Sequence, residues 1–498
     1  MKTRAAPDIA IQIAKRGQTR DRAARQGPCM KPRRLQDRTY FALLAALMLA
    51  ALATTMAAYW PGLMTWDAIR QYGQAIDGDF DDWHPPAMEW LWRQLMPIHD
   101  GPAPMLVLQL LFYWSGFAGL AAWALSRQRR GLAAALAACG LLPLAMALMG
   151  AVLKDCLMAA LLVCVTAALF WSDGAARPRL RTALRIAGII LLLAAATLRF
   201  NAFCACLPLF VALLPASWTR GPIRLAGSAI IATALLMGAM PLANRLIGAE
   251  KSGVELSLVI FDLGGITEQS GVNQFPEMGV TDPVAANHRC YTPVKWDSYS
   301  FWVDPLCPLG FDPFRAVVQQ RHLSPYRLWI GAILAHPIAY AEHRLRHFNI
   351  NTRFLVHDEI ERPVQIESAP NDWHYGVRPS GLLSVIDRLA TLSAATPIGW
   401  PITWLALALG ALIASPWLPS RRLIVPLALS ALLYGLGYGV FSVAAELRYH
   451  LWTMIGGLIA SVLVAGDLAA LPATPWRRLG WAYAPAALVL VLAIAWRV

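Results

Sequence analysis

The chain has 498 residues, of which 57% are hydrophobic and 15% are charged. A soluble domain carries about 25% charged residues, so this composition excludes an ordinary soluble protein and indicates a multi-pass membrane protein. The net charge of +13 lies mainly in short segments between apolar stretches, where positive charge sets orientation. We therefore expect no nucleic-acid partner.

Residues 1–38 are basic, and we expect them to form a disordered cytoplasmic tail. The apolar stretches that follow reach or approach the ~20 residues that cross a bilayer. They cover 39–59, 104–125, 131–150, 153–172, 183–199, 202–216, 224–246, 397–414, 423–443, 449–467 and 480–496. With the N-terminus inside, the short basic segments also lie inside, as the positive-inside rule requires. The sequence predicts an all-α polytopic fold with about eleven transmembrane helices.

This topology divides the chain into three parts after the tail. Residues 39–246 form an N-terminal transmembrane module whose first outer loop is 60–103, and residues 397–498 form the C-terminal transmembrane helices. Between them, residues 247–396 are predicted to form a mixed, mostly helical extracytoplasmic domain. Cys290 and Cys307 of this domain could form a disulfide in an oxidising compartment.

Within that domain we expect one amphipathic helix over 324–349 that lies along the membrane interface. His336, His343 and His347 share one face of it, and two histidines four residues apart can bind zinc, but the intervening glutamate of metalloproteases is missing. The glycines of residues 261–266 are expected to make a turn.

The first outer loop is acidic and aromatic and contains candidate catalytic groups. Thr65 can cap a helix with Asp67 in its first turn, where the helix dipole favours a carboxylate. Asp77-Gly78 ends that helix, and Pro86 suits the start of a second helix over 87–95. Asp67 is either a helix-start acid or a general base at the membrane surface.

Four more acids and a histidine lie close together between residues 77 and 84 of this loop. Asp77, Asp79, Asp81 and Asp82 could bind a divalent cation through oxygen ligands, although such a run is also typical of a solvated turn. His84, next to these acids, either is structural or holds an acceptor or a phosphate. No residue is assigned as a metal ligand.

Polar residues also interrupt several apolar stretches, at the outer ends of the predicted spans. They are Lys154, Asp155, Arg199, Asn201, Glu446, Arg448, Tyr449 and His450. A charge inside a span costs about 2.5–3.5 kcal/mol, and each cation alone could be snorkelling or structurally paired. Together they predict a site for an anionic lipid headgroup, with Lys154, Arg199 and Arg448 as a phosphate clamp.

These motifs resemble the GT-C superfamily of polytopic glycosyltransferases. The resemblance rests on Pro61-Gly62 with Asp67, residues 82–85, Lys154-Asp155, residues 199–202 and residues 447–449. It implies transfer of a sugar from a polyprenyl-phosphate carrier to a lipid or glycan acceptor, with inversion, at the outer face of a bacterial inner membrane.

The resemblance also implies roles for individual residues. Asp67 becomes the base, with Asp82 as a second candidate and His84 beside them. Many relatives have adjacent acids at the position of Asp67, whereas here Trp66 and Ala68 flank it. The substrate-binding set comprises Lys154, Asp155, Arg199, Asn201, Arg448, Tyr449 and His450. Trp296, Trp302 and Trp373 are candidates for stacking on the sugar.

Three other functions fit the composition. A lipid or solute transporter would place polar groups near the bilayer midplane and often has internal repeats, neither of which the sequence indicates. A lipid-linked polysaccharide polymerase or ligase would share the cation clamp. A structural membrane protein would need none of these groups.

Overall fold

A computed structural model describes residues 31–357, 367–473 and 475–498, and the first 30 residues of the predicted tail lie outside it. Helix α2 (Lys31–Tyr59) begins inside that tail, so residues 31–38 are helical rather than disordered. The described residues are otherwise helices and loops with three isolated β-bridges and no strand. The predicted all-α fold is confirmed.

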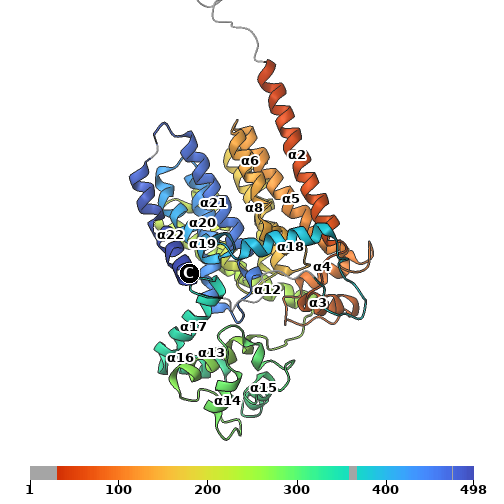
Figure 1. The fold of residues 1–498 in the computed structure, drawn as a ribbon, viewed down its shortest axis with the longest axis vertical. Helices are drawn as coiled ribbons and strands as arrows, with labels where there is room; N and C mark the ends of the chain where they lie inside the picture. The colour runs from red at the N-terminus through yellow and green to blue at the C-terminus, as the bar shows by residue number, and fades with distance from the viewer. Residues whose placement is uncertain (1–30, 358–366, 474) are drawn as a thin grey trace, which may run out of the picture. The chain divides into compact units, whose positions relative to one another are not determined.

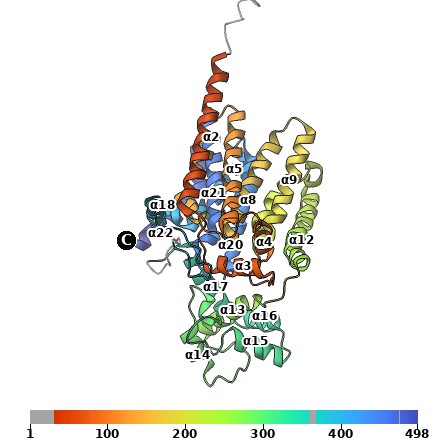
Figure 2. The same ribbon diagram turned by 90° about the vertical axis from the view of Figure 1, so that its right-hand side faces the viewer.

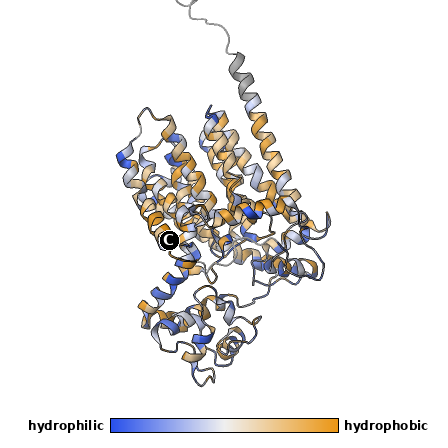
Figure 3. Ribbon diagram, in the orientation of Figure 1, coloured by the Kyte–Doolittle hydropathy of each residue, from blue (hydrophilic) through white to orange (hydrophobic). Residues whose placement is uncertain are grey.

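Seven described helices are long and apolar enough to cross a membrane. Besides α2 they are α5 (Ala103–Ser126), α8 (Lys154–Gly174), α12 (Pro222–Ile247), α20 (Arg421–Phe441), α21 (Leu451–Ala470) and α22 (Trp476–Arg497). Figure 3 shows hydrophobic residues along most of their length. The chain is therefore a multi-pass membrane protein.

The predicted number of about eleven spans is not confirmed. Most of the remaining apolar stretches form short helices, namely α6 (Arg130–Cys139), α7 (Pro143–Leu148), α10 (Ala202–Leu213), α11 (Ala216–Thr219) and α19 (Pro401–Ala414), followed by η3 (Ser415–Trp417). Helix α9 (Pro178–Ala196) is 19 residues long but has three arginines in its first eight residues. The stretch 131–150 is split before Pro143, which suits the first turn of a new helix but cannot continue an old one. At 1.5 Å per residue, neither piece crosses the hydrocarbon alone.

Helix α8 is the most buried of the long helices and packs against α5 and α9. Its contact with α5 needs Gly116, because a Cβ there would lie 2.7 Å from Val163 Cγ1. Arg129, just before α6, forms a 3.0 Å ion pair with Asp467 near the end of α21. Lys154 is the first residue of α8, and Arg448 lies just before the first residue of α21, far along the helix from Asp467. The candidate site lies where these two helices begin.

The first outer loop folds as its sequence predicts. Thr65 caps α3 (Trp66–Asp77) by accepting a hydrogen bond from the Ala68 amide, and Gly78 ends the helix with φ +85°. Helix α4 (Ala87–Leu95) follows. The start of the loop is fixed where the Leu63 amide donates to the Gly150 carbonyl at 3.0 Å.

The part of the chain predicted to be extracytoplasmic, which we call the outer domain, forms a cluster of short helices around one hydrophobic core (Figures 1 and 2). They are α13 (Glu255–Ser270), α14 (Pro283–Cys290), η1 (Trp296–Tyr299), α15 (Phe311–Gln320), α16 (Pro325–Ala335) and α17 (Pro337–Thr352). A disulfide joins Cys290 to Cys307. After the gap at 358–366 the chain forms α18 (Gly381–Ala394) and η2 (Pro397–Gly399).

Two expectations for this domain are wrong. Residues 261–266 lie inside α13 rather than in a turn, and a Cβ at Gly265 would overlap the ring of His343. The glycines there allow close packing and do not mark a bend. The predicted helix 324–349 is two helices, because Pro337 starts a new helix after His336.

Candidate functional site

The carboxylate of Asp67 is the centre of a compact polar cluster. Arg448 Nη1 lies 2.9 Å and Lys154 Nζ lies 3.6 Å from Asp67 Oδ2. His84 Nε2 lies 3.8 Å from Asp67 Oδ1. Between 10% and 23% of each of these four side chains is exposed, so the charges meet in a partly desolvated site. We call these four residues the Asp67 cluster.

Four separate segments bring the cluster together. Asp67 occupies the first turn of α3, which the Thr65 cap fixes. Lys154 is the first residue of α8, and Arg448 lies in the short helix η4 (Leu447–His450) between α20 and α21. His84 follows a turn in which the Trp83 amide donates to Asp81 Oδ1 at 2.9 Å.

The contacts of His84 identify its protonation state. Its Nδ1 lies 2.6 Å from Lys154 Nζ, and an ammonium group can only donate, so Nδ1 accepts. The ring proton therefore sits on Nε2, which faces Asp67. Burial and the nearby Lys154 charge lower the pKa of His84 to about 3, so the ring is neutral near pH 7.

Asp67 is held in its ionised form. Burial would raise its pKa, but the positive charges of Arg448 and Lys154 outweigh burial and hold the pKa well below its ordinary value. A carboxylate in this state is a weak base as long as both cations remain on it. Its strength as a base therefore depends on what else those cations bind.

Arg199 differs from the clamp that the sequence predicts. It pairs with Asp155, which is 1% exposed, instead of facing Asp67. Its guanidinium carbon lies 4.3 Å from the ring centre of Tyr449, which stacks on Tyr438. Arg199 and Asp155 thus support Tyr449, the neighbour of Arg448, and only two of the three predicted cations contact Asp67.

Three other predicted site residues have separate partners. Asp82 Oδ1 accepts hydrogen bonds from the amide and the hydroxyl of Ser252, both at 2.7 Å. His450 is buried and contacts Asn351 of α17, and Asn201 is buried at the start of α10. Within the described ranges, no hydrogen bond or ion pair joins any of these three to Asp67.

The run of acids in the first outer loop is dispersed. Asp81 pairs with Arg70, and Asp77 and Asp79 are exposed. No group of three or more histidine, cysteine or acidic side chains suited to a metal ion occurs in the part of the chain that the structure describes. His343 and His347 are buried and bond to Asp262 and to the Pro293 carbonyl.

The candidate sugar-stacking tryptophans lie in different places. Trp296 is 5% exposed and belongs to the core of the outer domain. Trp302 is half-exposed and contacts Trp83. Trp373 packs on Tyr72 of α3, with ring centres 4.9 Å apart.

Glu89 lies on α4 within electrostatic reach of Lys154 and did not stand out in the sequence. It is 1% exposed, and burial raises its pKa to about 8. The one sequence feature that could have indicated it is an acidic residue placed between apolar and aromatic residues in a short amphipathic helix.

No family model and no curated protein matches this sequence. Among solved structures, the chain is similar to the oligosaccharyltransferase AglB of Archaeoglobus fulgidus, determined with an inhibitory peptide and a dolichol-phosphate (12% identity, TM-score 0.34). A second structure of the Archaeoglobus fulgidus oligosaccharyltransferase carries a tethered acceptor peptide (10% identity, TM-score 0.35). Both matches cover 91% of this chain and 55% of the other, so the chain spans about half the length of those proteins.

The chain is also similar to ArnT of Cupriavidus metallidurans, determined with bound undecaprenyl phosphate. That match has 14% identity and a TM-score of 0.31, and it covers 92% of this chain and 88% of the other. At these identities and TM-scores, the matches assign neither a family nor an activity to the protein.

Proposed function

We propose that this protein is a membrane glycosyltransferase that moves a sugar from a polyprenyl-phosphate carrier to an acceptor hydroxyl. The reaction would take place at the outer face of a bacterial inner membrane. The observation that supports this proposal best is the contact of Asp67 with both Lys154 and Arg448 where helices end. The GT-C-like motifs of the sequence point to the same reaction.

The two cations suit a lipid-linked phosphate. Arg448 offers a planar fork that can bind two phosphate oxygens, and Lys154 offers a compact charge. Both are at least 87% buried as side chains (13% and 10% exposed), so their attraction for an anion is less screened than at an open surface. Lys154 also stands at the N-terminus of α8, where the helix dipole favours a negative charge.

A donor phosphate would compete with Asp67 for these cations. As Lys154 and Arg448 turn to the phosphate, the pKa of Asp67 rises from its depressed value toward that of a useful base. Binding of the donor thus activates the base. His84 lies beside the carboxylate, with Nε2 3.8 Å from Oδ1.

The chemical step is a single displacement. Asp67 takes the proton of the acceptor hydroxyl as its oxygen forms a bond to C1 of the sugar. The bond between C1 and the phosphate oxygen breaks, and its electron pair leaves with the lipid phosphate. Lys154 and Arg448 stabilise the charge that develops there, which is commonly the largest catalytic effect. Attack opposite the leaving group inverts the anomeric carbon.

The test is transfer of a radiolabelled sugar from polyprenyl-phosphate donors in proteoliposomes that contain the full chain and extracted envelope lipids and glycans. We expect release of polyprenyl phosphate together with labelled product, and a loss of at least a hundredfold in Lys154→Gln or Arg448→Gln. The matched control is Arg245→Gln, an exposed cation at the end of α12. Lipid movement across the bilayer without sugar transfer would instead support a transporter.

A further inference from the structure

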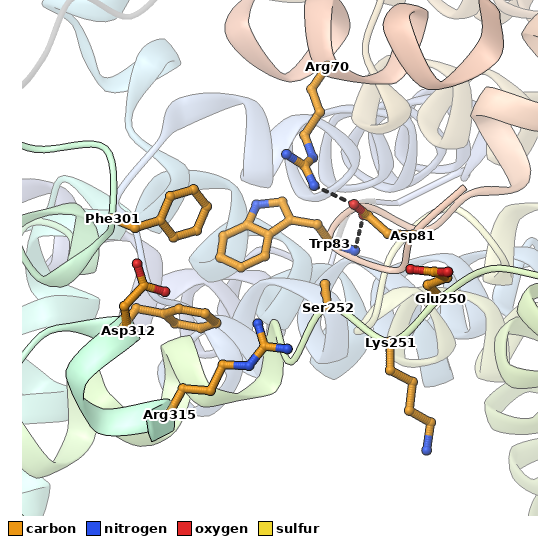
Figure 4. A pocket seen from close by; sticks show the side chains of 10 residues that line it. Arg70, Asp81, Trp83, Glu250, Lys251, Ser252, Phe301, Asp312 and Arg315 are labelled. Atoms are coloured by element: carbon orange, nitrogen blue, oxygen red, sulfur yellow. Dashed lines mark hydrogen bonds and ion pairs between the residues drawn. The ribbon is translucent and has the colours of Figure 1, made fainter. Parts of the chain in front are cut away.

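A cavity of about 350 Å³ lies beside the first outer loop, outside the Asp67 cluster. Its walls come from the turn at residues 81–83, from residues 250–252 and from α15 with the loop before it (Figure 4). The volume is at the small end of ligand pockets, which measure about 300–1,000 Å³. It suits one or two sugar rings better than a lipid chain.

One side of this cavity is aromatic. The ring centre of Trp83 lies 5.4 Å from those of Phe301 and Phe311. Phe301 is 41% exposed although it is a large apolar side chain. Sugar rings have an apolar face of C–H groups that packs on aromatic rings. Such a wall therefore suits a carbohydrate.

The other side of the cavity offers donors and acceptors of balanced charge. The lining includes three cations and three carboxylates, namely Arg70, Lys251, Arg315, Asp81, Glu250 and Asp312. Asp81 neutralises Arg70. The Arg315 side chain points into the cavity (Figure 4) and forms no ion pair or hydrogen bond with any described residue.

An uncharged ligand fits this lining better than an anionic one. A phosphate or carboxylate group could pair with Arg315 or Lys251, but it would also lie close to the carboxylates of Glu250 and Asp312 in the same small space. Sugar hydroxyls both donate and accept, so they can bond to the guanidinium and to the carboxylates at once. The cavity therefore differs from the Asp67 cluster, where Lys154 and Arg448 can turn from Asp67 to a phosphate.

The cavity is connected to the Asp67 cluster through neighbouring residues in the chain and through a backbone hydrogen bond. Trp83 in its wall precedes His84, which faces Asp67. Arg70 lies three residues after Asp67 on α3. The Asp82 amide donates to the Glu250 carbonyl at 3.0 Å, which fixes the turn to the opposite wall. A ligand held in the cavity therefore lies against the same turn that positions His84.

We propose that this cavity binds an uncharged, hydroxyl-rich sugar unit of the acceptor, with Trp83 and Phe301 as the stacking surface and Arg315 as the specificity-determining hydrogen-bond donor. This inference rests on the proposed glycosyl transfer. It assigns the acceptor class as a neutral glycan or glycolipid headgroup. Asp82, which the sequence suggested as a second base, instead fixes the wall of this acceptor pocket.

The proposal is tested by direct binding to the full chain in detergent, without any donor. Saturation-transfer NMR measures the affinity for methyl β-D-glucopyranoside, methyl α-D-mannopyranoside and maltose, with α-D-glucose 1-phosphate as the anionic probe. The variants are Arg315→Gln and Phe301→Ala, both at partly exposed positions. Arg321→Gln is the control, because Arg321 caps the same helix and is half-exposed but lies outside the cavity.

We expect at least one neutral glycoside to bind, and both variants to weaken it about tenfold while the control does not. Absence of binding by all neutral probes, or equal binding by Arg315→Gln and wild type, overturns the proposal. Tighter binding of the sugar phosphate that depends on Arg315 overturns the assignment to an uncharged acceptor.

Transfer assays separate this inference from the proposed function. If glycosides bind through Arg315 but no donor sugar is transferred, the cavity is a carbohydrate site and the glycosyltransferase assignment fails. If sugar is transferred and the variants leave the acceptor KM unchanged, the glycosyltransferase assignment stands and the acceptor pocket is refuted. In the expected case the acceptor KM rises about tenfold with an unchanged donor KM.

Discussion

Replacing Asp67 by asparagine separates catalysis from donor binding, because the carboxylate has opposite effects on the two. As the proposed base, Asp67 contributes to turnover, and removing a general base costs about 10²- to 10⁴-fold. As the partner of Arg448 at 2.9 Å and Lys154 at 3.6 Å, it competes with the donor phosphate. A unit-charge contact near 4 Å is worth about 4 kcal/mol at an effective dielectric of 20.

Only part of that energy is recovered when the donor binds, because the carboxylate is 23% exposed and shared between two cations. We expect Asp67→Asn to bind polyprenyl phosphate about tenfold more tightly, which corresponds to about 1.4 kcal/mol, and to turn over at least a hundredfold more slowly. Binding is measured by equilibrium dialysis with radiolabelled lipid in detergent, and turnover by single-turnover transfer in proteoliposomes.

Asp77→Asn is the control for this prediction, since Asp77 is an exposed acid at the end of the same helix. It should change neither quantity. A variant Asp67→Asn that keeps more than a tenth of wild-type turnover would refute the role as base. Loss of donor binding together with turnover would mean that Asp67 only holds the site in shape.

Other consequences of the structure can be measured independently. Arg448→Lys keeps the charge but loses the planar fork, so the donor KM should rise about tenfold; an unchanged KM in steady-state transfer assays would argue against phosphate binding there. Glu89 has its pKa raised by burial to about 8, so its contribution to stability is full below the unfolded pKa near 4.5 and is lost as the pH rises through 8. Glu89→Gln should therefore flatten the decline in thermal midpoint between about pH 5 and pH 9, and parallel pH curves for variant and wild type would contradict this. Asn351 donates to Ser442 Oγ at 2.9 Å and to the Ala444 carbonyl at 3.0 Å, in the segment that leads to Arg448. Asn351→Ala should raise the donor KM several-fold with a smaller change in kcat, whereas a purely structural role would lower the amount of folded protein and leave KM unchanged. Addition of EDTA should not change the transfer rate, because Lys154 and Arg448 already supply the positive charge that a divalent cation would bring; loss of transfer on chelation would contradict this.

Local signals in the first outer loop were sufficient to predict its helices. A capping threonine, an aspartate-glycine stop and a helix-starting proline act within a few residues, so α3 and α4 follow from the sequence. The placement of Lys154 and Arg448 beside Asp67 agrees with a simple argument about helix ends. Charged residues at the same ends of spans are brought near one another once the helices pack.

The ion pairs and hydrogen bonds inside the site could not be predicted, because they depend on which side chains from distant segments lie next to each other in the fold. Arg199 lies just after the end of α9, as Lys154 lies at the start of α8, yet Arg199 pairs with the buried Asp155. Asp82, the other candidate base, lies in the loop after α3 and accepts hydrogen bonds from Ser252 instead. Spacing in sequence carries no information about such contacts between segments 44 or 170 residues apart.

Two stretches predicted as single helices are each divided by a proline. The stretch 131–150 is hydrophobic throughout, and only Pro143 signalled that it divides into α6 and α7. The helix expected over 324–349 is divided in the same way at Pro337. In both cases the hydrophobic pattern predicts one continuous helix. The structure follows the proline instead, because proline cannot continue the hydrogen-bond ladder.

The central claim is that Lys154 and Arg448 bind the phosphate of a lipid carrier, and native mass spectrometry of the detergent-solubilised protein tests it most directly. The protein is mixed with equal amounts of polyprenyl phosphate and the corresponding uncharged polyprenol. We predict that wild type and Arg245→Gln retain the phosphate-bearing lipid at least tenfold over the alcohol, and that Lys154→Gln and Arg448→Gln lose this preference. Equal retention of both lipids by wild type, or an unchanged preference in the two variants, would contradict the account.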